Sequence, residues 1–229
     1  IDMAVALMGA MAAGAQTAPL NPALTDRELL PLLGDVDAAV IFCDAGTEQR
    51  ARELAKETGI PNVRSAAADF DIWALASNPD NRLPDSLPAP DRRAAMFFTG
   101  GTTGVPKGAE HTHHRLSVFA PLIHAAWNFR FDAETILNVA PMFHVWGHQF
   151  TLVFPLYLRA TMVIVPQYSP KLVLAELQRN RVTVFAGGPA AIFLGLLAAD
   201  SIDDTDLSAL QYSIAGGSAC PESLLARWH

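Results

Sequence analysis

Charged residues are scarce in this sequence. Asp, Glu, Lys and Arg make up 17% of its 229 residues, whereas hydrophobic residues make up 51%. An ordinary soluble domain is roughly one quarter charged, so this chain has ample material for a core and little for a surface. We therefore expect further protein to cover some of its faces.

Basic residues and cysteines are also few. Sixteen Lys and Arg against 23 Asp and Glu give a formal net charge of −7, which excludes the broad basic surface of a nucleic-acid-binding protein. A polyanion could therefore bind only at a local group of basic residues. The two cysteines, Cys43 and Cys220, are too few for a disulfide framework and too far apart for a metal knuckle. So few cysteines are typical of the reducing cytoplasm, and we therefore predict a cytoplasmic protein.

A targeting segment is lacking as well. Residues 1–15 are rich in Ala, Gly and Met, but they have no basic flank and Asp2 interrupts them, so neither a signal peptide nor a membrane-spanning helix fits. We expect a buried helix whose small side chains let it lie close to a sheet. Because no Met precedes this segment, we expect the chain to be a piece of a longer protein.

Strand and helix patterns alternate along the first part of the chain. Thr25 and Glu28 form a capping-box pattern, and Gly34 is the expected end of that helix. The unbroken apolar run at 38–43 predicts a strand buried on both faces of a parallel sheet. A helix that Gly59 ends should follow.

The rest of the chain predicts further βαβ units. Residues 77–93 hold four prolines among Asn and Asp, which is typical of a linker. Beyond it we expect a helix from Lys171, with Ser169 as N-cap and Pro170 in its first turn, and another beginning after Pro221. The expected strands lie at residues 94–98, 135–139, 161–165, 182–185 and 211–215.

Together these patterns predict an α/β fold of mostly parallel sheets covered by helices, incomplete at both ends. We expect residues 1–76 to form part of a first α/β subdomain, 77–93 a proline-rich linker, and 94–229 a phosphate loop with part of a second α/β subdomain.

The segment TGGTTGVPKG, from Thr99 to Gly108, is the most informative. Its glycines let backbone amides turn towards an anion, its threonines add hydroxyl donors, and its lysine adds a positive charge. A Walker A loop is excluded because Pro106 and Gly108 flank Lys107. A flexible Gly/Thr hairpin is the alternative interpretation. The candidate phosphate-binding residues are Thr99, Gly100, Gly101, Thr102, Thr103, Gly104 and Lys107.

The longer stretch FFTGGTTGVPKGAEHTHHRLS resembles the signature of the adenylate-forming (AMP-binding) superfamily, which includes acyl-CoA synthetases, adenylation domains and luciferases. Further segments that resemble the family follow in its order: APMFHVWGH, VTVFAGGPA and DLSALQYSIAGGSACPESL. The chain is most similar to a fatty acyl-CoA synthetase. This resemblance implies a fragment of the large N-terminal domain, without the C-terminal catalytic domain, and with little or no turnover of its own.

The resemblance also implies the chemistry. ATP and a carboxylic acid form an acyl-adenylate with Mg²⁺, and CoA then takes the acyl group. Lys107 and the loop residues would stabilise the departing pyrophosphate, and His144 would face the carboxylate. The implied acyl-substrate residues are His144, Trp146, Gly147, Gly187, Gly188 and Pro189. The implied adenine contacts are Gly216, Gly217 and Ser218.

Each of these residues also has an ordinary structural interpretation. His144 is also compatible with a hydrogen-bonded core histidine, and Trp146 with simple helix packing. His144 and His148 have helical spacing, but Val145 stands where a zinc hydrolase needs Glu. Three further histidines lie close together without an acidic partner at ligand spacing, so we predict no metal site in this chain. These are His111, His113 and His114.

Two rival functions stay open at this stage. One is an adenylation domain that loads a carrier protein, or a ligase for aryl acids. The other is a non-catalytic nucleotide-binding remnant. Acid class, oligomeric state and peripheral membrane contact are left open by the sequence.

Overall fold

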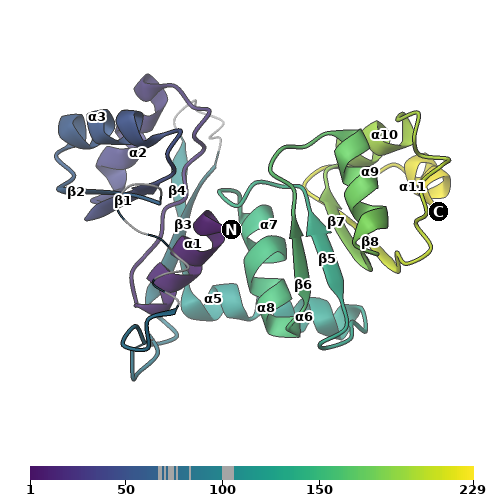
Figure 1. Ribbon diagram of the computed structural model, residues 1–229, viewed down its shortest axis with the longest axis horizontal. Coiled ribbons are helices and arrows are strands. Elements are labelled where there is room, and N and C mark those ends of the chain that lie inside the picture. The colour runs from purple at the N-terminus through teal and green to yellow at the C-terminus, as the bar shows by residue number, and fades with distance from the viewer. Residues whose placement is uncertain (67–68, 70, 72–74, 76, 83, 100–105) are drawn as a thin grey trace. The chain divides into compact units, whose positions relative to one another are not determined.

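The computed structural model describes residues 1–66, 69, 71, 75, 77–82, 84–99 and 106–229. By their internal contacts they form two compact units, Ile1–His114 and Arg115–His229 (Figure 1). This boundary lies C-terminal to the linker expected at 77–93. The subdomain assignment made from the sequence stays a prediction.

The first unit is built around a parallel βαβ crossover. Strands β1 (Val40–Cys43) and β2 (Asn62–Ser65) pair in parallel, and helix α3 (Glu48–Thr58) connects them. Leucines and alanines of α3 and of helix α2 (Asp26–Val36) pack with Ile60 and Val63 into one core. Gly59 ends α3 with φ +74°, as the sequence predicts.

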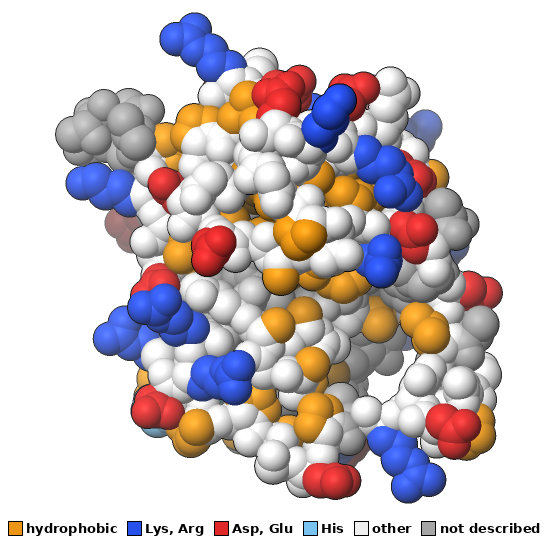
Figure 2. Space-filling view, turned by 90° about the vertical axis from the view of Figure 1, so that its left-hand side faces the viewer, with side chains coloured by type: hydrophobic (Ala, Val, Ile, Leu, Met, Phe, Trp, Pro, Cys, Tyr) orange, Lys and Arg blue, Asp and Glu red, His pale blue; other side chains and the backbone are white. Residues whose placement is uncertain are grey.

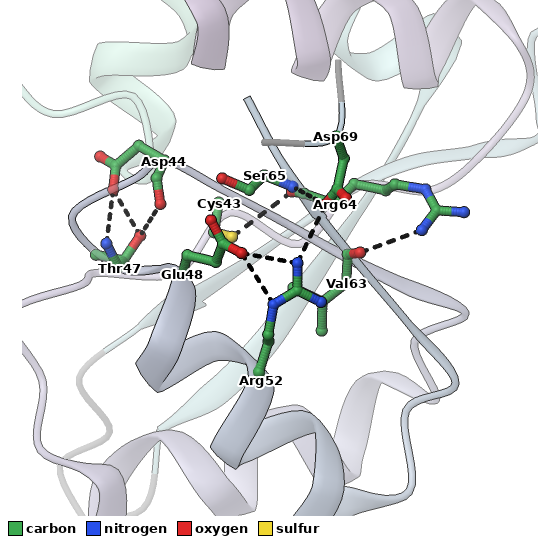
Figure 3. Close-up of polar contacts among 9 residues, drawn as sticks. All are labelled: Cys43, Asp44, Thr47, Glu48, Arg52, Val63, Arg64, Ser65 and Asp69. Carbon is green, nitrogen blue, oxygen red and sulfur yellow. Dashed lines mark hydrogen bonds and ion pairs between the residues drawn. The ribbon is translucent and has the colours of Figure 1, made fainter. Parts of the chain in front are cut away.

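An ion-pair cluster ties α3 to the end of β2 (Figure 3). The Arg52 guanidinium donates to Glu48 at 2.7 Å and lies 3.4 Å from Asp69, while Asp69 accepts from the Ser65 backbone N–H at 2.8 Å. The hydrogen bond from Arg52 lowers the pKa of Glu48. Burial, together with Glu48 and Asp44, raises the pKa of the Cys43 thiol. A raised pKa disfavours the reactive thiolate, so we interpret this cluster as structural.

Three expectations for the first unit are wrong. Helix α1 (Asp2–Ala12) forms, but only Leu7 and Met11 of it are buried, and Met3 and Val5 are 42% and 44% exposed. Phe42 in β1 is 50% exposed, so this strand is not buried on both faces. Helix α2 continues past Gly34 and ends at Asp37, which adopts the left-handed conformation.

On the face drawn in Figure 2, hydrophobic side chains lie between interspersed acidic and basic ones.

An antiparallel pair completes the first unit. Strands β3 (Arg93–Thr99) and β4 (Lys107–Thr112) pair from Arg93↔Thr112 to Thr99↔Lys107, and helix α5 (His113–Ser117) follows. Strand β3 is the expected strand at 94–98. Its antiparallel partner β4 was not expected from the sequence, because the polar segment KGAEHT carries no strand pattern.

The second unit is a four-stranded, all-parallel sheet in the order β6-β5-β7-β8. The four strands expected here from the sequence are all present, and the predicted α/β fold class is confirmed. Their bounds are β5 Thr135–Asn138, β6 Thr161–Ile164, β7 Val184–Gly188 and β8 Tyr212–Ala215.

Helices cover both faces of this sheet. One core packs around Phe150 and Phe154, and the other around Phe185 and Phe193. Helix α9 begins with Pro170 after Ser169, as predicted. No helix among the described residues is both long and apolar enough to cross a membrane. The elements are α6 Phe119–Ala126, α7 Val145–His148, the π-helix η1 Gln149–Val153, α8 Phe154–Leu158, α9 Pro170–Arg179, α10 Ala190–Leu197 and α11 Glu222–Trp228.

Candidate functional site

Most of the candidate residues of the second unit gather at one edge of its sheet. Strands β5, β7 and β8 are adjacent and parallel, so the segments after their carboxyl ends meet at that edge (Figure 1). These segments are 139–144 with α7 after β5, Pro189 after β7, and 216–218 after β8. This is the edge at which open α/β sheets bind ligands.

A buried asparagine holds the turn that leads to His144. Asn138 is 4% exposed. Its amide accepts from the Ala140 N–H at 3.2 Å, donates to the Ala140 carbonyl at 3.0 Å and donates to the Thr151 hydroxyl at 2.7 Å. Thr151 lies in η1, and such single π turns occur often at functional sites. Asn138 therefore joins the turn to the helix behind it.

His144 is exposed and caps helix α7. Its Nδ1 accepts the backbone N–H of Trp146 at 3.2 Å. In the neutral imidazole the other nitrogen must then carry the proton. Nε2 is thus a hydrogen-bond donor at the carboxyl edge of the sheet. The alternative of a core histidine is wrong, because this side chain reaches solvent.

The Trp146 ring lies against the backbone of two neighbouring strands. An ideal Cβ on Gly216 would lie 2.3 Å from its Cζ3, and one on Gly188 would lie 3.6 Å from its Nε1. The ring also packs on Phe150, with 4.7 Å between centroids. The structure therefore brings Trp146, Gly188 and Gly216 together.

The segment after β8 is tied to the end of β7. The Gly216 N–H donates to the Gly188 carbonyl at 2.9 Å. Gly217 has φ +79°, a conformation that side chains with a Cβ adopt at a cost. The Ser218 hydroxyl accepts from the Ala190 N–H at 3.1 Å, which satisfies one donor at the start of α10.

Two other candidate glycines are fully packed. A Cβ on Gly147 would lie 1.9 Å from the Pro141 carbonyl oxygen. A Cβ on Gly187 would lie 2.7 Å from the rings of Phe185 and Phe193. Close packing is thus a sufficient reason for glycine at both positions, and their assignment to the substrate stays a prediction.

The phosphate-loop candidates belong to the first unit. Thr99 and Lys107 face each other at the end of the β3–β4 pair, and the Thr99 hydroxyl donates to the Lys107 carbonyl at 3.3 Å. Both residues are exposed. The other candidates lie outside the described residues: Gly100, Gly101, Thr102, Thr103 and Gly104.

From the sequence we predicted that the histidines near β4 and α7 do not form a metal site. Within the described ranges, no three His, Cys, Asp or Glu side chains come together as a metal-binding group.

The sequence reasoning missed a buried carboxylate at the opposite edge of the sheet. Glu134 is 2% exposed and accepts from the Arg130 backbone and guanidinium and from the Thr183 hydroxyl. Burial raises the pKa of Glu134, but these hydrogen bonds outweigh it and hold the pKa below its usual value. Asn138 was missed too. In both cases, a polar residue next to a buried apolar run is the sequence feature that indicates a buried, hydrogen-bonded side chain.

Comparisons with known proteins agree over the whole chain. The family model described as "AMP-binding enzyme" matches residues 1–229. A long-chain-fatty-acid–CoA ligase of Bacillus subtilis (strain 168) is 32% identical over 130 residues, which are 56% of this chain and 23% of that protein. A mitochondrial malonate–CoA ligase of Mus musculus is 26% identical over 244 residues, covering 100% of this chain and 41% of that protein.

The solved structures show the same fold. ATP-bound MatB from Rhodopseudomonas palustris has a TM-score of 0.85 to this chain at 22% identity, over 99% of this chain and 44% of that one. The chain thus spans less than half the length of the mouse relative and of MatB.

Proposed function

Because the chain belongs to the AMP-binding enzyme family, we propose that the protein carrying it is an ATP-dependent acid–thiol ligase. A carboxylate oxygen attacks the α-phosphorus of ATP, the bond to the bridging oxygen breaks, and pyrophosphate leaves. The CoA thiolate then attacks the acyl carbon, and AMP leaves as the acyl–oxygen bond breaks. The observation that carries this proposal is the family match over the entire chain.

His144 has the geometry of a carboxylate-binding residue. Because Nδ1 is occupied by the Trp146 N–H, the neutral ring presents Nε2–H to a ligand at the sheet edge. A hydrogen bond from that N–H would orient the acid and partly offset its charge while the carboxylate oxygen attacks phosphorus. Helix α7 and the turn held by Asn138 fix the position of the ring.

Lys107 has the chemistry to stabilise the leaving pyrophosphate. It is exposed at the start of β4, next to the glycine-rich segment, and among the described residues no carboxylate lies within ion-pair distance of it. A mobile ammonium group suits phosphate oxygens. The developing charge on pyrophosphate is the charge that a cation can stabilise in the transition state.

The glycines after β8 suit the adenine ring. Gly217 lies in the turn at the carboxyl edge, and among the described residues an ideal Cβ on it would meet only Pro189, at 4.0 Å, so a planar base can approach this residue closely. Gly216 can contribute only its backbone, because Trp146 occupies the space where its side chain would be. The Ser218 hydroxyl accepts a hydrogen bond from the start of α10. We propose that this bond holds the turn in place.

The acid and the acceptor are the finer parts of the proposal. The two relatives are named for long-chain fatty acids and for malonate, so family membership leaves the size of the acid open. The resemblance to fatty acyl-CoA synthetases favours CoA as the acceptor. We keep a cytoplasmic setting as a prediction.

The test uses the natural full-length protein that contains these residues. We expect pyrophosphate release that requires both ATP and a carboxylic acid, and thioester formation when CoA is added. Lys107→Ala should lower kcat, because the cation on the leaving group is lost. Lys56→Ala removes an exposed lysine of α3 and serves as the matched control, with unchanged kinetics.

The outcomes separate the rival functions. Pyrophosphate release without transfer to CoA would favour the adenylation domain that loads a carrier protein. ATP binding without release for any aliphatic or aromatic acid would favour the non-catalytic remnant and refute the ligase.

A further inference from the structure

The helix that begins after His144 contains a π-turn. Helix α7, η1 and helix α8 follow one another without a break from Val145 to Leu158, and the five residues of η1 form the π segment. A π-turn closes with i→i+5 hydrogen bonds, so it holds one residue more than an α-turn and changes the direction of the side chains that follow. Such turns are rare and are found frequently at functional sites.

The π-turn contains a threonine whose hydroxyl meets the end of β5. Thr151 is 6% exposed, and its hydroxyl accepts a hydrogen bond from the Asn138 amide at 2.7 Å. The same amide nitrogen donates to the Ala140 carbonyl at 3.0 Å, and the amide oxygen accepts from the Ala140 N–H at 3.2 Å. Both N–H groups of the buried amide are thus engaged, one by the turn and one by the helix.

The bond between Asn138 and Thr151 closes a loop that has His144 near its middle. From Asn138 the chain runs through the turn to His144, then along α7 into η1, and meets Asn138 again thirteen residues later. Inside this loop the His144 N–H donates to the Pro141 carbonyl at 3.0 Å. A Cβ on Gly147 would lie 1.9 Å from the same carbonyl oxygen, so α7 packs directly on the turn.

The contacts of His144 move with this loop. Its Nδ1 accepts from the Trp146 N–H and its backbone N–H donates to Pro141, and both partners belong to the loop itself. These bonds set the orientation of the imidazole within the loop. The buried bond of Thr151 ties the helix back to the strand, so it fixes where the loop, and with it the imidazole, lies on the sheet.

We propose that Thr151 is a positioning residue for acid activation, which acts through Asn138 to hold His144 where its Nε2–H meets the carboxylate. The inference rests on the proposed function and adds to it a buried residue of the π-turn. A displacement of about 1 Å in a reacting geometry can cost on the order of a hundredfold in rate. Loss of this remote hydroxyl should therefore appear in kcat.

The experiment compares variants of the natural full-length protein by acid-dependent pyrophosphate release. Thr151→Val keeps the size of the side chain and removes the hydroxyl, and we expect kcat to fall by about tenfold or more with KM for ATP unchanged. Thr151→Ser keeps the hydroxyl and should retain most of the wild-type kcat. Thr205→Val is the matched control, because it removes another partly buried hydroxyl, which donates to the Ser201 carbonyl at 2.6 Å, and it should leave kcat unchanged.

A double-mutant cycle separates positioning from a general loss of stability. His144→Ala removes the group that Thr151 is proposed to position, so adding Thr151→Val to it should lower kcat little further. The urea midpoint should fall by the same amount in both backgrounds, because the bond to Asn138 is lost in each. A purely structural role would instead lower kcat by the same factor with and without His144.

Each contrary result has a distinct meaning. An unchanged kcat in Thr151→Val overturns the proposal, and an equal fold-loss of kcat in the His144→Ala background overturns the route through His144. If Thr151→Val does not fold, Thr151→Ala is compared with Thr151→Ser, and equal kcat values in these two overturn the proposal. Absence of pyrophosphate release by the wild type with every acid refutes the proposed function, and the inference with it.

Discussion

The buried Glu134 carboxylate offers the sharpest prediction about stability. It lies at the amino edge of the parallel sheet, where it joins β5 to β7 through Thr183. Its oxygens accept from the Arg130 N–H at 2.9 Å, from Arg130 Nε at 3.0 Å and Nη2 at 3.3 Å, and from the Thr183 hydroxyl. Glu134→Gln keeps the size of the side chain and replaces one accepting oxygen by an NH₂ donor.

The expected cost follows from these contacts. Two donors lose their acceptor, and a hydrogen bond to a charged group contributes about 1.5–3 kcal/mol. The Arg130 side chain is 52% exposed, so its lost bond is largely replaced by water and counts little. We therefore expect Glu134→Gln to lower the free energy of unfolding by about 2 kcal/mol at neutral pH.

The pH dependence has a definite sign. Because the folded-state pKa of Glu134 is lowered, its stabilising effect is present above the unfolded-state pKa of about 4.3. It is lost as the pH falls through the lower folded-state pKa. The difference between wild type and Glu134→Gln should therefore shrink in acid.

Urea unfolding of the full-length protein, followed by tryptophan fluorescence at neutral and acid pH, tests this. Asp132→Asn is the control, since it removes the carboxylate of an exposed pair with Arg159 and should leave the midpoint unchanged. Equal midpoints for the two variants would refute the reasoning. The kcat/KM of folded Glu134→Gln protein should equal that of the wild type, because the candidate site lies at the opposite edge of the sheet.

Three further variants test the site. His144→Asn keeps an N-cap acceptor for the Trp146 N–H but removes the imidazole Nε2–H, so kcat should fall as in His144→Ala. Full activity of the Asn variant would mean that His144 only caps α7. Gly217→Ala should cost about 1 kcal/mol of stability from its positive φ alone, measured by urea unfolding; no loss would contradict that backbone conformation. Asn138→Ala should destabilise by about 1–3 kcal/mol and lower kcat while KM for ATP stays constant, and a change in stability alone would mean that Asn138 does not position His144.

Local patterns predicted most of the second unit. The apolar runs at 135–139 and 182–185, and the Ser169–Pro170 start of α9, depend on neighbouring residues alone, so the sequence indicates them directly. The first unit was harder. The apolar residues of α1 and β1 predict burial, but only the packing of the unit shows that their outer faces stay exposed.

The sequence by itself determined which candidate residues the chain offers, namely a histidine after a buried strand, a lysine after a glycine-rich segment, and glycines at strand ends. Only the tertiary structure decided what those residues touch. The contact of Trp146, which follows β5, with Gly216, which follows β8, joins residues from separate βαβ units. Such contacts depend on the order of strands in the sheet, which no local period encodes.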